Sequence, residues 1–560
     1  MQGTDSPFWP AMELASPSVP DASLYMNLQA TEKRSPNKAA IIFNGESIDY
    51  SRVLQQVEQL AGHLQQVCGI GRGDRVVLYT QNSPQYVIAY YAILRADAVV
   101  VPVNPMNKSD ELWHCISDSG ATAIITTTDV YSQVAPLLGK GDFLHAVVGA
   151  YSDVLGDVPE GRAIAAKATP DTSPLKEAGA VLWWDALKVD RTATPAMAGG
   201  DDPAVMPYTS GTTGNPKGCL HTHRSIMTGI VNSVAWHGLR DDDILLATVP
   251  MFHVTGMQTN LNTPVYLGNT VVILSRWSPA AAVKLIRQHQ ITQWTAIATM
   301  VIDLLSLEDL ELDDLRSLRY VRGGGAPMPE AVATKLRELL GLTYIEGYGL
   351  TETMAAVLFN PPRNPKLHCA GIPMQGVDAL IVEPGSVTEL SRGSVGEILL
   401  SSGQLFSGYW RQPKADAETF VVIDDKRFMR TGDLGYADAD GYVFIVDRLK
   451  RMINAAGFKV WPSEVEGMLY AHPAIQEACV VAVQDSHRGE TVKAFIVLKS
   501  SSRGVVTEAD VIEWSRQKMA AYKYPRIVEF RESLPRSGTG KVMWRTLQDN
   551  ENRPPQQSER

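Results

Sequence analysis

The chain has 560 residues, of which 45% are hydrophobic and 20% are charged, and its formal net charge is -10 at pH 7. These proportions are those of a globular protein and exclude wholesale disorder or a collagen-like repeat. One hydrophobic core rarely organises a chain of this length, so we expect at least two domains. No lysine- and arginine-rich stretch is dense enough to follow a nucleic-acid backbone, so we expect no nucleic-acid partner.

The N-terminus and the cysteines indicate the compartment. Residues 1–23 are broken by prolines and acidic residues and lack the basic start and apolar core of a signal peptide. No apolar run is long enough to span a membrane, so we expect no integral membrane segment. The five cysteines form no CxxC pair, so neither a disulfide framework nor a zinc knuckle is indicated. We therefore predict a cytoplasmic protein.

From about Asp74 to Ser275, short β-rich runs such as "RVVLYT" and "AVVVPVNP" alternate with helical patterns. This alternation predicts βαβ units around a mainly parallel sheet. Residues 141–200 are irregular and rich in small residues and proline, with one apolar patch at "VLWWDAL". We expect this segment to be a long surface excursion and not a domain.

The segment Tyr208–Gly218, "YTSGTTGNPKG", predicts a phosphate cradle. It follows a strand-like run, "DPAVMPY", and precedes a helical pattern, "THRSIMTGIV", so we expect a strand, a loop and a helix in that order. Glycines allow a close backbone approach, and Lys217 adds a positive charge. Aliphatic hydroxyls come from Thr209, Ser210, Thr212 and Thr213. A flexible surface loop is the alternative interpretation.

Other phosphate and metal motifs fit poorly. Lys217 is followed by glycine where a Walker A loop has Ser or Thr. The run Ser537–Val542 imitates that loop, but Pro535 replaces its first glycine and Val542 its magnesium ligand. The closely spaced ligand types in "CLHTH", Cys219–His223, lack further ligands, so we assign no transition metal.

After Gly393 the pattern changes to short strands and turns, and "DADGYV" predicts a β-hairpin. We place a domain boundary just after Asp447, because the remainder of the chain has the pattern of a small α+β domain.

Seven segments in chain order carry a resemblance to a known family. They are "YTSGTTGNPKG", "PMFHVTG" at 250–256, "RGGGAPMP" at 322–329, "GYGLTET" at 347–353, "TGDLG" at 431–435, "DRLKRMINAAGFKVWPSEVE" at 447–466 and "PRSGTGKV" at 535–542. One such segment alone is a weak signal, but seven in order are specific. The chain resembles the acyl-adenylate-forming superfamily of acyl-CoA synthetases, peptide-synthetase adenylation domains and beetle luciferases. Bacterial medium- or long-chain fatty acyl-CoA synthetases are most similar in general pattern.

The resemblance implies an α/β fold. A large N-terminal domain, residues 1–449, has mixed sheets with flanking helices plus a small distorted barrel and binds ATP and the acyl group. A small mobile α+β domain, residues 450–560, carries the catalytic lysine. The implied activity is ATP-dependent ligation of a carboxylic acid to coenzyme A through an acyl-adenylate, with release of AMP and pyrophosphate. ATP, Mg²⁺ and coenzyme A are therefore the expected cofactors and co-substrates, and a homodimer is an open alternative.

The resemblance also assigns the catalytic residues. Lys541 bridges the carboxylate and the α-phosphate, Thr351 contacts the α-phosphate, and Glu352 holds the magnesium ion. His253 corresponds to an aromatic gate or carboxylate-orienting residue near the acyl entrance; a histidine packed in the core is the alternative.

ATP recognition is implied for residues from five of these segments. The turn at 323–327, which we call the glycine turn, forms one wall of the adenine slot. Tyr348 packs against the base, and Asp433 and Arg448 bind the ribose. The full set is Thr209, Ser210, Gly211, Thr212, Thr213, Gly214, Lys217, Gly323, Gly324, Gly325, Ala326, Pro327, Gly347, Tyr348, Gly349, Asp433 and Arg448.

The resemblance places a hinge at Lys450 and a path for the coenzyme A arm at Gly457 and Lys459. The chain departs from the common pattern at Ala455 and Ala456, where serine or glycine is frequent, and at Arg322, where a small residue is frequent.

The acyl-pocket walls of the family correspond to residues 254–262, 295–305 and 323–325, which are largely apolar. An apolar lining favours a hydrocarbon-bearing acid over an amino acid, whose ammonium group needs an acidic partner. A medium- or long-chain fatty acid is the expected substrate, and an aryl acid is the alternative. A carrier-protein acceptor, a luciferase-like oxygenase and a non-catalytic binding protein also stay open, although Lys541, Glu352 and Lys217 together argue against the last.

Overall fold

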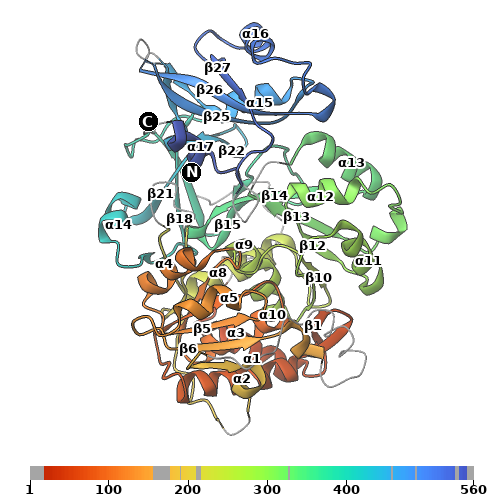
Figure 1. Ribbon diagram of the computed structural model, residues 1–560, viewed down its shortest axis with the longest axis vertical. Coiled ribbons are helices and arrows are strands. Elements are labelled where there is room, and N and C mark those ends of the chain that lie inside the picture. Colours follow the sequence, from red (N-terminus) through yellow and green to blue (C-terminus); the bar gives the residue numbers. More distant parts are fainter. Residues whose placement is uncertain are drawn as a thin grey trace, which may run out of the picture. The chain divides into compact units, whose positions relative to one another are not determined.

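The computed structural model describes residues 18–155, 177–188, 191–209, 216–325, 328–455, 458–485, 489–536 and 542–551. The chain divides into two compact units: unit 1 comprises Met1–Ala379 and Ser401–Met429, and unit 2 comprises Leu380–Leu400 and Arg430–Arg560. The chain passes from one unit to the other within strands β17 (Val377–Val382), β18 (Gly396–Ser402) and β21 (Lys426–Ala437) (Figure 1).

An eight-stranded sheet forms one layer of unit 1, with the order β19-β9-β8-β4-β3-β5-β6-β7. Strands β3 to β8 pair in parallel, whereas β9 pairs antiparallel with β8 and with β19. The strands are β3 (Arg75–Tyr79), β4 (Val99–Pro102), β5 (Ala123–Thr127), β6 (His145–Gly149), β7 (Ala180–Leu182), β8 (Pro203–Val205), β9 (Cys219–Thr222) and β19 (Gly408–Tyr409).

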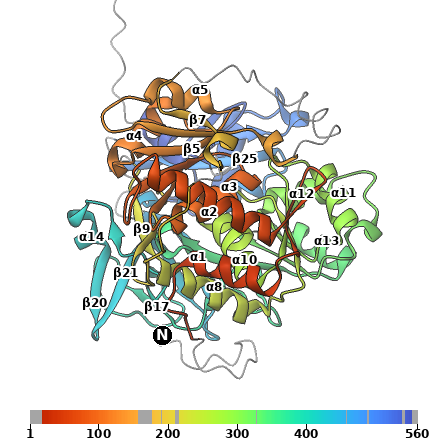
Figure 2. The ribbon, with the colours of Figure 1, turned by 90° about the horizontal axis from the view of Figure 1, so that it is seen from below.

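Helix α3 (Pro84–Arg95) is buried along its whole length. It begins at Ser83, whose Oγ accepts a hydrogen bond from the Tyr86 backbone N–H, and Pro84 occupies the first turn. Helices α1 (Leu24–Arg34) and α2 (Tyr50–Gln66) pack beside it (Figure 2). A helix enclosed in this way is apolar on every side, as the run "PQYVIAYYAILR" is.

The second sheet of unit 1 has nine strands in the order β16-β15-β14-β13-β12-β10-β11-β1-β2. Its central strands are parallel, and β14, β15 and β16 pair antiparallel. The strands are β1 (Ala39–Phe43), β2 (Glu46–Asp49), β10 (Ile244–Ala247), β11 (Thr270–Ile273), β12 (Gln293–Thr295), β13 (Tyr320–Gly324), β14 (Tyr344–Leu350), β15 (Ala355–Phe359) and β16 (Ile372–Pro373).

Helices cover the two faces of this sheet. On one face, Trp294, Val321 and Tyr344 pack into a core with α11 (Pro279–His289), α12 (Ala298–Leu305) and α13 (Glu330–Leu340). Side chains alternate along a strand, so the next residues, Thr295 and Arg322, point to the opposite face. There, Arg322 contacts helix α8 (His223–His237).

Further α-helices of unit 1 lie within the described residues. They are α4 (Ser109–Ser119), α5 (Tyr131–Val134), α7 (Trp183–Ala186), α9 (Val254–Met257), α10 (Thr263–Leu267) and α14 (Pro413–Thr419). Between α9 and α10, residues Gln258–Asn262 form one turn of π-helix. Strand β20 (Phe420–Ile423) pairs with the unit 1 residues of β21.

Three local predictions for unit 1 are wrong. The β-rich runs from 74 to 275 build two sheets and not one, because β10 and β11 pair with β12 and β1. The segment 141–200 is more than a surface excursion, since β6 and β7 extend the eight-stranded sheet. The hydroxyl-rich loop joins two strands before the helix begins, because "CLHT" pairs with β8 as strand β9.

Unit 2 contains the predicted hairpin, in which β21 pairs with β22 (Val443–Arg448). A further sheet has the order β24-β23-β26-β25, with β27 beside β26. Its elements are β23 (Ile453–Ala455), β24 (Phe458–Val460), β25 (Ile475–Asp485), β26 (Gly489–Leu498), β27 (Ile527–Phe530), α15 (Pro462–Tyr470), α16 (Glu508–Lys518) and α17 (Trp544–Glu551). Within the described ranges, none of the helices has the length and hydropathy of a membrane span.

Candidate active site

The ends of the hydroxyl-rich loop lie together at the start of β9. The backbone N–H of Thr209 donates to the carbonyl of Lys217 at 2.9 Å, and Tyr208 and Gly218 form an antiparallel bridge. The predicted loop residues Ser210, Gly211, Thr212, Thr213 and Gly214 lie outside the described residues. Backbone pairing therefore holds both flanks of the loop and fixes the position of the Lys217 backbone.

Lys217, Tyr409 and Glu352 form a group that we call the Tyr409 cluster. The Lys217 ammonium lies 4.9 Å from the centre of the Tyr409 ring, and the Tyr409 hydroxyl donates to Glu352 Oε1 at 2.7 Å. Strand β19 brings Tyr409 there by pairing with Cys219 of β9. Two predicted site residues, the phosphate-loop lysine and the magnesium carboxylate, thus share one tyrosine. Burial and the nearby carboxylate raise the pKa of Tyr409, so its hydroxyl keeps its proton.

A buried histidine positions the backbone next to this cluster. His221, on β9, has its Nε2 2.8 Å from the carbonyl oxygen of Thr351 and its Nδ1 3.3 Å from Ser225 Oγ. A carbonyl oxygen only accepts, so Nε2 carries the proton. Burial lowers the pKa of His221 to about 4, so the ring is neutral near pH 7. The Phe406 N–H donates to the Glu352 carbonyl, so both residues of the Thr351–Glu352 pair are held.

His223, the other histidine of "CLHTH", serves the fold. Its Nδ1 accepts a hydrogen bond from the Leu24 backbone N–H at 3.1 Å, and burial lowers its pKa to about 4. Among the residues that the structure describes, no group of three or more His, Cys, Asp and Glu side chains is arranged to hold a metal ion. The two histidines are therefore accounted for by hydrogen bonds.

The predicted adenine-slot glycines pack tightly against neighbouring strands. A Cβ atom on Gly323 would lie 1.9 Å from the Ala296 carbonyl oxygen, and one on Gly349 would lie 1.9 Å from the Ala355 carbonyl oxygen. Strand packing alone thus requires glycine at both positions. Gly324 and Gly347 are partners across β13 and β14, and Gly325 follows. Ala326 and Pro327 lie outside the described residues.

The other unit 1 candidates are placed as follows. Tyr348 is half-buried on β14, three residues before Thr351. His253 is the N-cap of α9, where its Nδ1 accepts from the Thr255 N–H at 3.4 Å. Three side chains of the predicted apolar wall at 254–262 are in fact buried amides. They are Gln258, Asn260 and Asn262.

Unit 2 brings together the two predicted ribose residues. Asp433 and Arg448 are directly opposite each other across β21 and β22, and Arg448 Nε lies 3.0 Å from Asp433 Oδ1. Lys450 is exposed in the short turn after β22, and Lys459 is exposed on β24. The predicted Gly457 and the predicted catalytic Lys541 lie outside the described residues.

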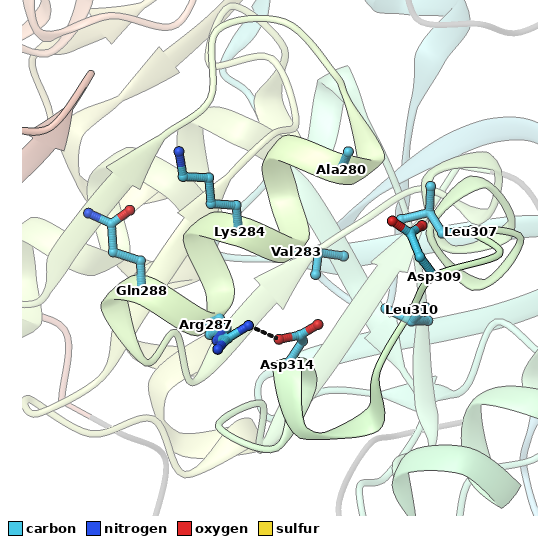
Figure 3. Close-up of a pocket in the computed structure, with 9 residues that line it drawn as sticks. All are labelled: Ala280, Val283, Lys284, Arg287, Gln288, Leu307, Asp309, Leu310 and Asp314. Carbon is cyan, nitrogen blue, oxygen red and sulfur yellow. Dashed lines mark hydrogen bonds and ion pairs between the residues drawn. The ribbon is translucent and has the colours of Figure 1, made fainter.

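A surface pocket of 410 Å³ lies elsewhere in unit 1, between α11 and the segment after α12 (Figure 3). Its lining includes Lys284 and an ion pair of 3.2 Å between Arg287 and Asp314. None of the predicted site residues lines it, so this pocket is separate from the Tyr409 cluster.

Sequence comparison defines the family. The pattern described as AMP-binding enzyme matches residues 28–410, and that described as AMP-binding enzyme C-terminal domain matches residues 464–541. The chain therefore belongs to the AMP-binding enzyme family. This confirms the predicted relation to the adenylate-forming superfamily and the predicted α/β fold with a large and a smaller domain.

Individual relatives are acid–CoA ligases. The chain is 33% identical over 545 residues to the long-chain-fatty-acid–CoA ligase of Bacillus subtilis (strain 168), with 95% of each chain covered. It is 32% identical over 513 residues to the feruloyl-CoA synthase of an Amycolatopsis species, covering 91% of this chain and 95% of that one.

Two solved structures share the fold over nearly the whole chain. ATP-bound MatB from Rhodopseudomonas palustris has a TM-score of 0.83 at 26% identity, covering 95% of this chain and 99% of its own. The anthranilate CoA ligase AuaEII in complex with anthranoyl-AMP has a TM-score of 0.81 at 26% identity, covering 96% and 98%.

Proposed function

We propose that the chain is an ATP-dependent carboxylic acid:CoA ligase. In the first half-reaction the acid carboxylate attacks the α-phosphate of ATP, forming an acyl-adenylate and releasing pyrophosphate. In the second, the thiol of coenzyme A attacks the acyl carbon, and AMP leaves. The observation that carries this proposal is the Tyr409 cluster, in which Lys217 and Glu352 contact the same tyrosine in a chain of which 95% matches an acid–CoA ligase.

The first half-reaction brings two anions together, so positive charge is needed at the point of attack. We assign this role to Lys541, with Thr351 on the α-phosphate and His253 beside the carboxylate. Glu352 is the proposed magnesium ligand, and a bound ion would neutralise phosphate charge. One carboxylate is sufficient for such a site, because Mg²⁺ usually keeps several waters and takes its other ligands from substrate phosphates.

The proposed ATP contacts follow the same assignment. The loop from Thr209 to Lys217 cradles phosphates, the turn at 323–327 and Tyr348 hold adenine, and Asp433 with Arg448 binds the ribose. The close pairing of Asp433 and Arg448 across two strands supports a common task. A carboxylate can accept from two hydroxyls, while a guanidinium can donate to the same sugar.

For the second half-reaction we propose a hinge at Lys450 between domains of residues 1–449 and 450–560. Gly457 and Lys459 are the proposed coenzyme A contacts. Rotation at one hinge would allow a single site to catalyse both half-reactions in turn. A cytoplasmic location and a homodimer remain predictions from the sequence.

The proposed acid carries a hydrocarbon group, with a medium- or long-chain fatty acid first. The long-chain-fatty-acid–CoA ligase among the relatives supports this choice. An aryl acid is the second candidate, because relatives of similar identity include a feruloyl-CoA synthase.

A panel of fatty, aryl and amino acids, each with ATP, Mg²⁺ and coenzyme A, tests the proposal directly. We expect acid-dependent release of AMP and a thioester of the expected mass. Incubation with a purified carrier protein in place of coenzyme A tests the alternative acceptor. If no acid on the panel supports AMP release, the ligase proposal fails.

Two variants should separate the half-reactions. Lys541→Ala should reduce acid-dependent ATP–pyrophosphate exchange by about a hundredfold or more, yet it should still convert a supplied acyl-adenylate with coenzyme A. Lys450→Pro should behave in the opposite way and spare adenylation relative to thioester formation. Equal loss of both half-reactions in either variant contradicts the role assigned to that residue.

A further inference from the structure

A buried arginine lies on β13 immediately before the glycine turn. The Arg322 side chain is 2% exposed. Its Nε donates to Thr295 Oγ1 at 3.3 Å and its Nη1 donates to Ser233 Oγ at 3.2 Å, while its Cζ lies 5.7 Å from the centre of the Tyr320 ring. The Tyr320 hydroxyl is hydrogen-bonded to His237 Nδ1. We call these five residues the Arg322 cluster.

The guanidinium in this cluster forms no ion pair with a carboxylate of the described residues, and the attractions that it does experience come from Tyr320 and, among the carboxylates, from Asp243. No carboxylate forms an ion pair with Arg322 there, and the buried Nη2 has no hydrogen-bond acceptor. The carboxylate of Asp243 is engaged by Arg319 and by Thr292 Oγ1. Burial lowers the pKa of Arg322, but a guanidinium keeps its charge at neutral pH.

An unpaired buried charge is costly, because the solvation that it loses is not replaced. The lost solvation of the Arg322 guanidinium is replaced only if another molecule supplies a hydrogen-bond acceptor for Nη2. His237 Nε2, in the same cluster, is a second buried polar atom without a partner in the described part of the chain. Two unsatisfied polar groups around one tyrosine require partners that the described side chains do not supply, such as a polar ligand or ordered water.

The position of the cluster agrees with a ligand site. Thr295 ends β12, and Arg322 lies near the end of β13; these two strands are parallel. In open α/β sheets, ligands bind beyond the carboxyl ends of parallel strands. Thr295 is the first residue of the proposed acyl wall 295–305, and Arg322 directly precedes the proposed wall at 323–325. The cluster thus adjoins two of the proposed acyl walls along the chain.

We propose that Arg322 binds the far carboxylate of a dicarboxylic acid, so that the substrate class of this enzyme is a hydrocarbon chain with a carboxylate at each end. One carboxylate is adenylated, and the other accepts hydrogen bonds from Nη2 and Nη1 of Arg322. A carboxylate compensates the charge as well as the hydrogen bonds, whereas a neutral oxygen compensates only the latter. This inference rests on the proposed ligase function and narrows its acid.

The consequence for specificity is discrimination against plain fatty acids. A methyl end in this position would leave the guanidinium buried and unpaired, and sites built to hydrogen-bond a polar group reject analogues that lack it.

The test is a matched acid series with the full-length enzyme. Dicarboxylic acids of graded length are compared with monocarboxylic acids of equal carbon number and with the monomethyl esters of the diacids. Acid-dependent ATP–pyrophosphate exchange and thioester mass are the readouts. We expect kcat/KM for the best diacid to exceed that of its matched monoacid by about a hundredfold. Arg322→Met should lower the diacid value by about a hundredfold and raise the monoacid value several-fold.

Arg319→Met is the matched control, because Arg319 is an exposed neighbour on the same chain segment that pairs with Asp243. It should leave the ratio of diacid to monoacid activity as it is in the parent enzyme. Monoacids used as well as diacids by the parent enzyme, a ratio unchanged in Arg322→Met, or methyl esters used as well as diacids would each overturn the inference.

A binding measurement separates this inference from the ligase proposal. Titration calorimetry with the best diacid, in the absence of ATP, should show binding that Arg322→Met weakens by tenfold or more. If monoacids give AMP and diacids neither bind nor react, the ligase proposal stands and the dicarboxylate inference falls. If no acid gives AMP but the diacid binds through Arg322, the ligase proposal falls and the anion site stands.

Discussion

Unit 1 contains two clusters with ionised side chains, the Tyr409 cluster and the Arg322 cluster. They differ in how the charge of these side chains is balanced. In the Tyr409 cluster, Lys217 lies over the tyrosine ring and Glu352 accepts the tyrosine hydroxyl, so cation and anion each have a partner. In the Arg322 cluster, the side chain is 2% exposed and its guanidinium has hydroxyls and a ring beside it, but it forms no ion pair within the described part of the chain. One cluster is complete without a ligand, and the other is not.

The difference separates general chemistry from substrate choice. An enzyme that adenylates acids has to neutralise the same triphosphate whatever the acid is, so the role proposed for Lys217 and Glu352 applies to every acid. A cation whose partner is missing is complementary to one kind of ligand only. The comparison therefore predicts that substitutions in the Tyr409 cluster affect all acids alike, and that substitutions at Arg322 affect acids differently.

The largest effect should come from Glu352→Gln. Glutamine keeps an oxygen for the Tyr409 hydroxyl but removes the negative charge proposed to hold magnesium, so we expect adenylation to slow by about a hundredfold for every acid. ATP–pyrophosphate exchange at several Mg²⁺ concentrations measures this. Glu346→Gln, six residues earlier on β14, is the control: burial raises the pKa of Glu346 to about 7, so its charge is already partly lost at neutral pH. Similar losses in both variants would contradict the special role of Glu352.

Tyr409→Phe should have a smaller effect of the same kind. The phenyl ring still lies under Lys217, but Glu352 loses the donor at 2.7 Å. A hydrogen bond to a charged group contributes about 1.5–3 kcal/mol, so we expect about a tenfold loss or more in kcat/KM and a higher Mg²⁺ requirement. Tyr131→Phe removes a comparable bond, from Tyr131 to Glu177 at 2.8 Å, and should change neither. A normal Mg²⁺ requirement in Tyr409→Phe would show that the tyrosine does not position Glu352.

Local sequence patterns predicted several residues of the candidate site, but the contacts between residues far apart in the chain could not be predicted from them. The phosphate loop, Glu352 and the GGG turn each belong to a short motif, and the helix and strand sequence around them followed from periodicity. Partners far away in the chain carry no such signal: Tyr409 contacts Glu352 across 57 residues, and His221 contacts Thr351 across 130. "SGYW" and "CLHTH" are unremarkable until the strands β9 and β19 are paired.

Arg322 is a second example of a feature that depends on contacts between distant parts of the chain. As a departure from a family pattern it was visible in the sequence, but neither its burial nor its lack of an anion could be predicted from one strand. Both depend on α8, β12 and β13 meeting, which brings Ser233 and Thr295 to the guanidinium over 89 and 27 residues. The strand assignments failed for a related reason, since which sheet a short apolar run joins is decided by its neighbours in space.

The free energy of unfolding should distinguish Arg322 from its neighbour Arg319. Arg322→Met removes an unpaired buried charge, so we expect the ligand-free protein to gain about 1–2 kcal/mol in stability. Arg319→Met leaves the buried Asp243 carboxylate without its cation and should lower stability instead. Urea denaturation of both variants measures the two signs. Destabilisation by both substitutions would mean that the Arg322 charge is compensated in the free protein.

The smallest expected effect is a change in the pKa of His237. Burial, and then repulsion by Arg322, hold the pKa of His237 well below its usual value of 6.5. Removing the arginine charge makes the imidazolium less unfavourable, so Arg322→Met should raise this pKa while burial still keeps it below 6.5. A depressed folded-state pKa makes the protein lose stability as the pH falls below the unfolded pKa of the histidine, so the variant should also lose less stability than the parent as the pH is lowered below 6.5 through the folded pKa. His221 is the internal reference: its pKa of about 4 is set by burial and by its bond to Thr351, and should not move. Titration of both rings by NMR with labelled histidine would detect the difference, and equal pKa values for His237 in parent and variant would place the Arg322 charge too far away to belong to one cluster with it.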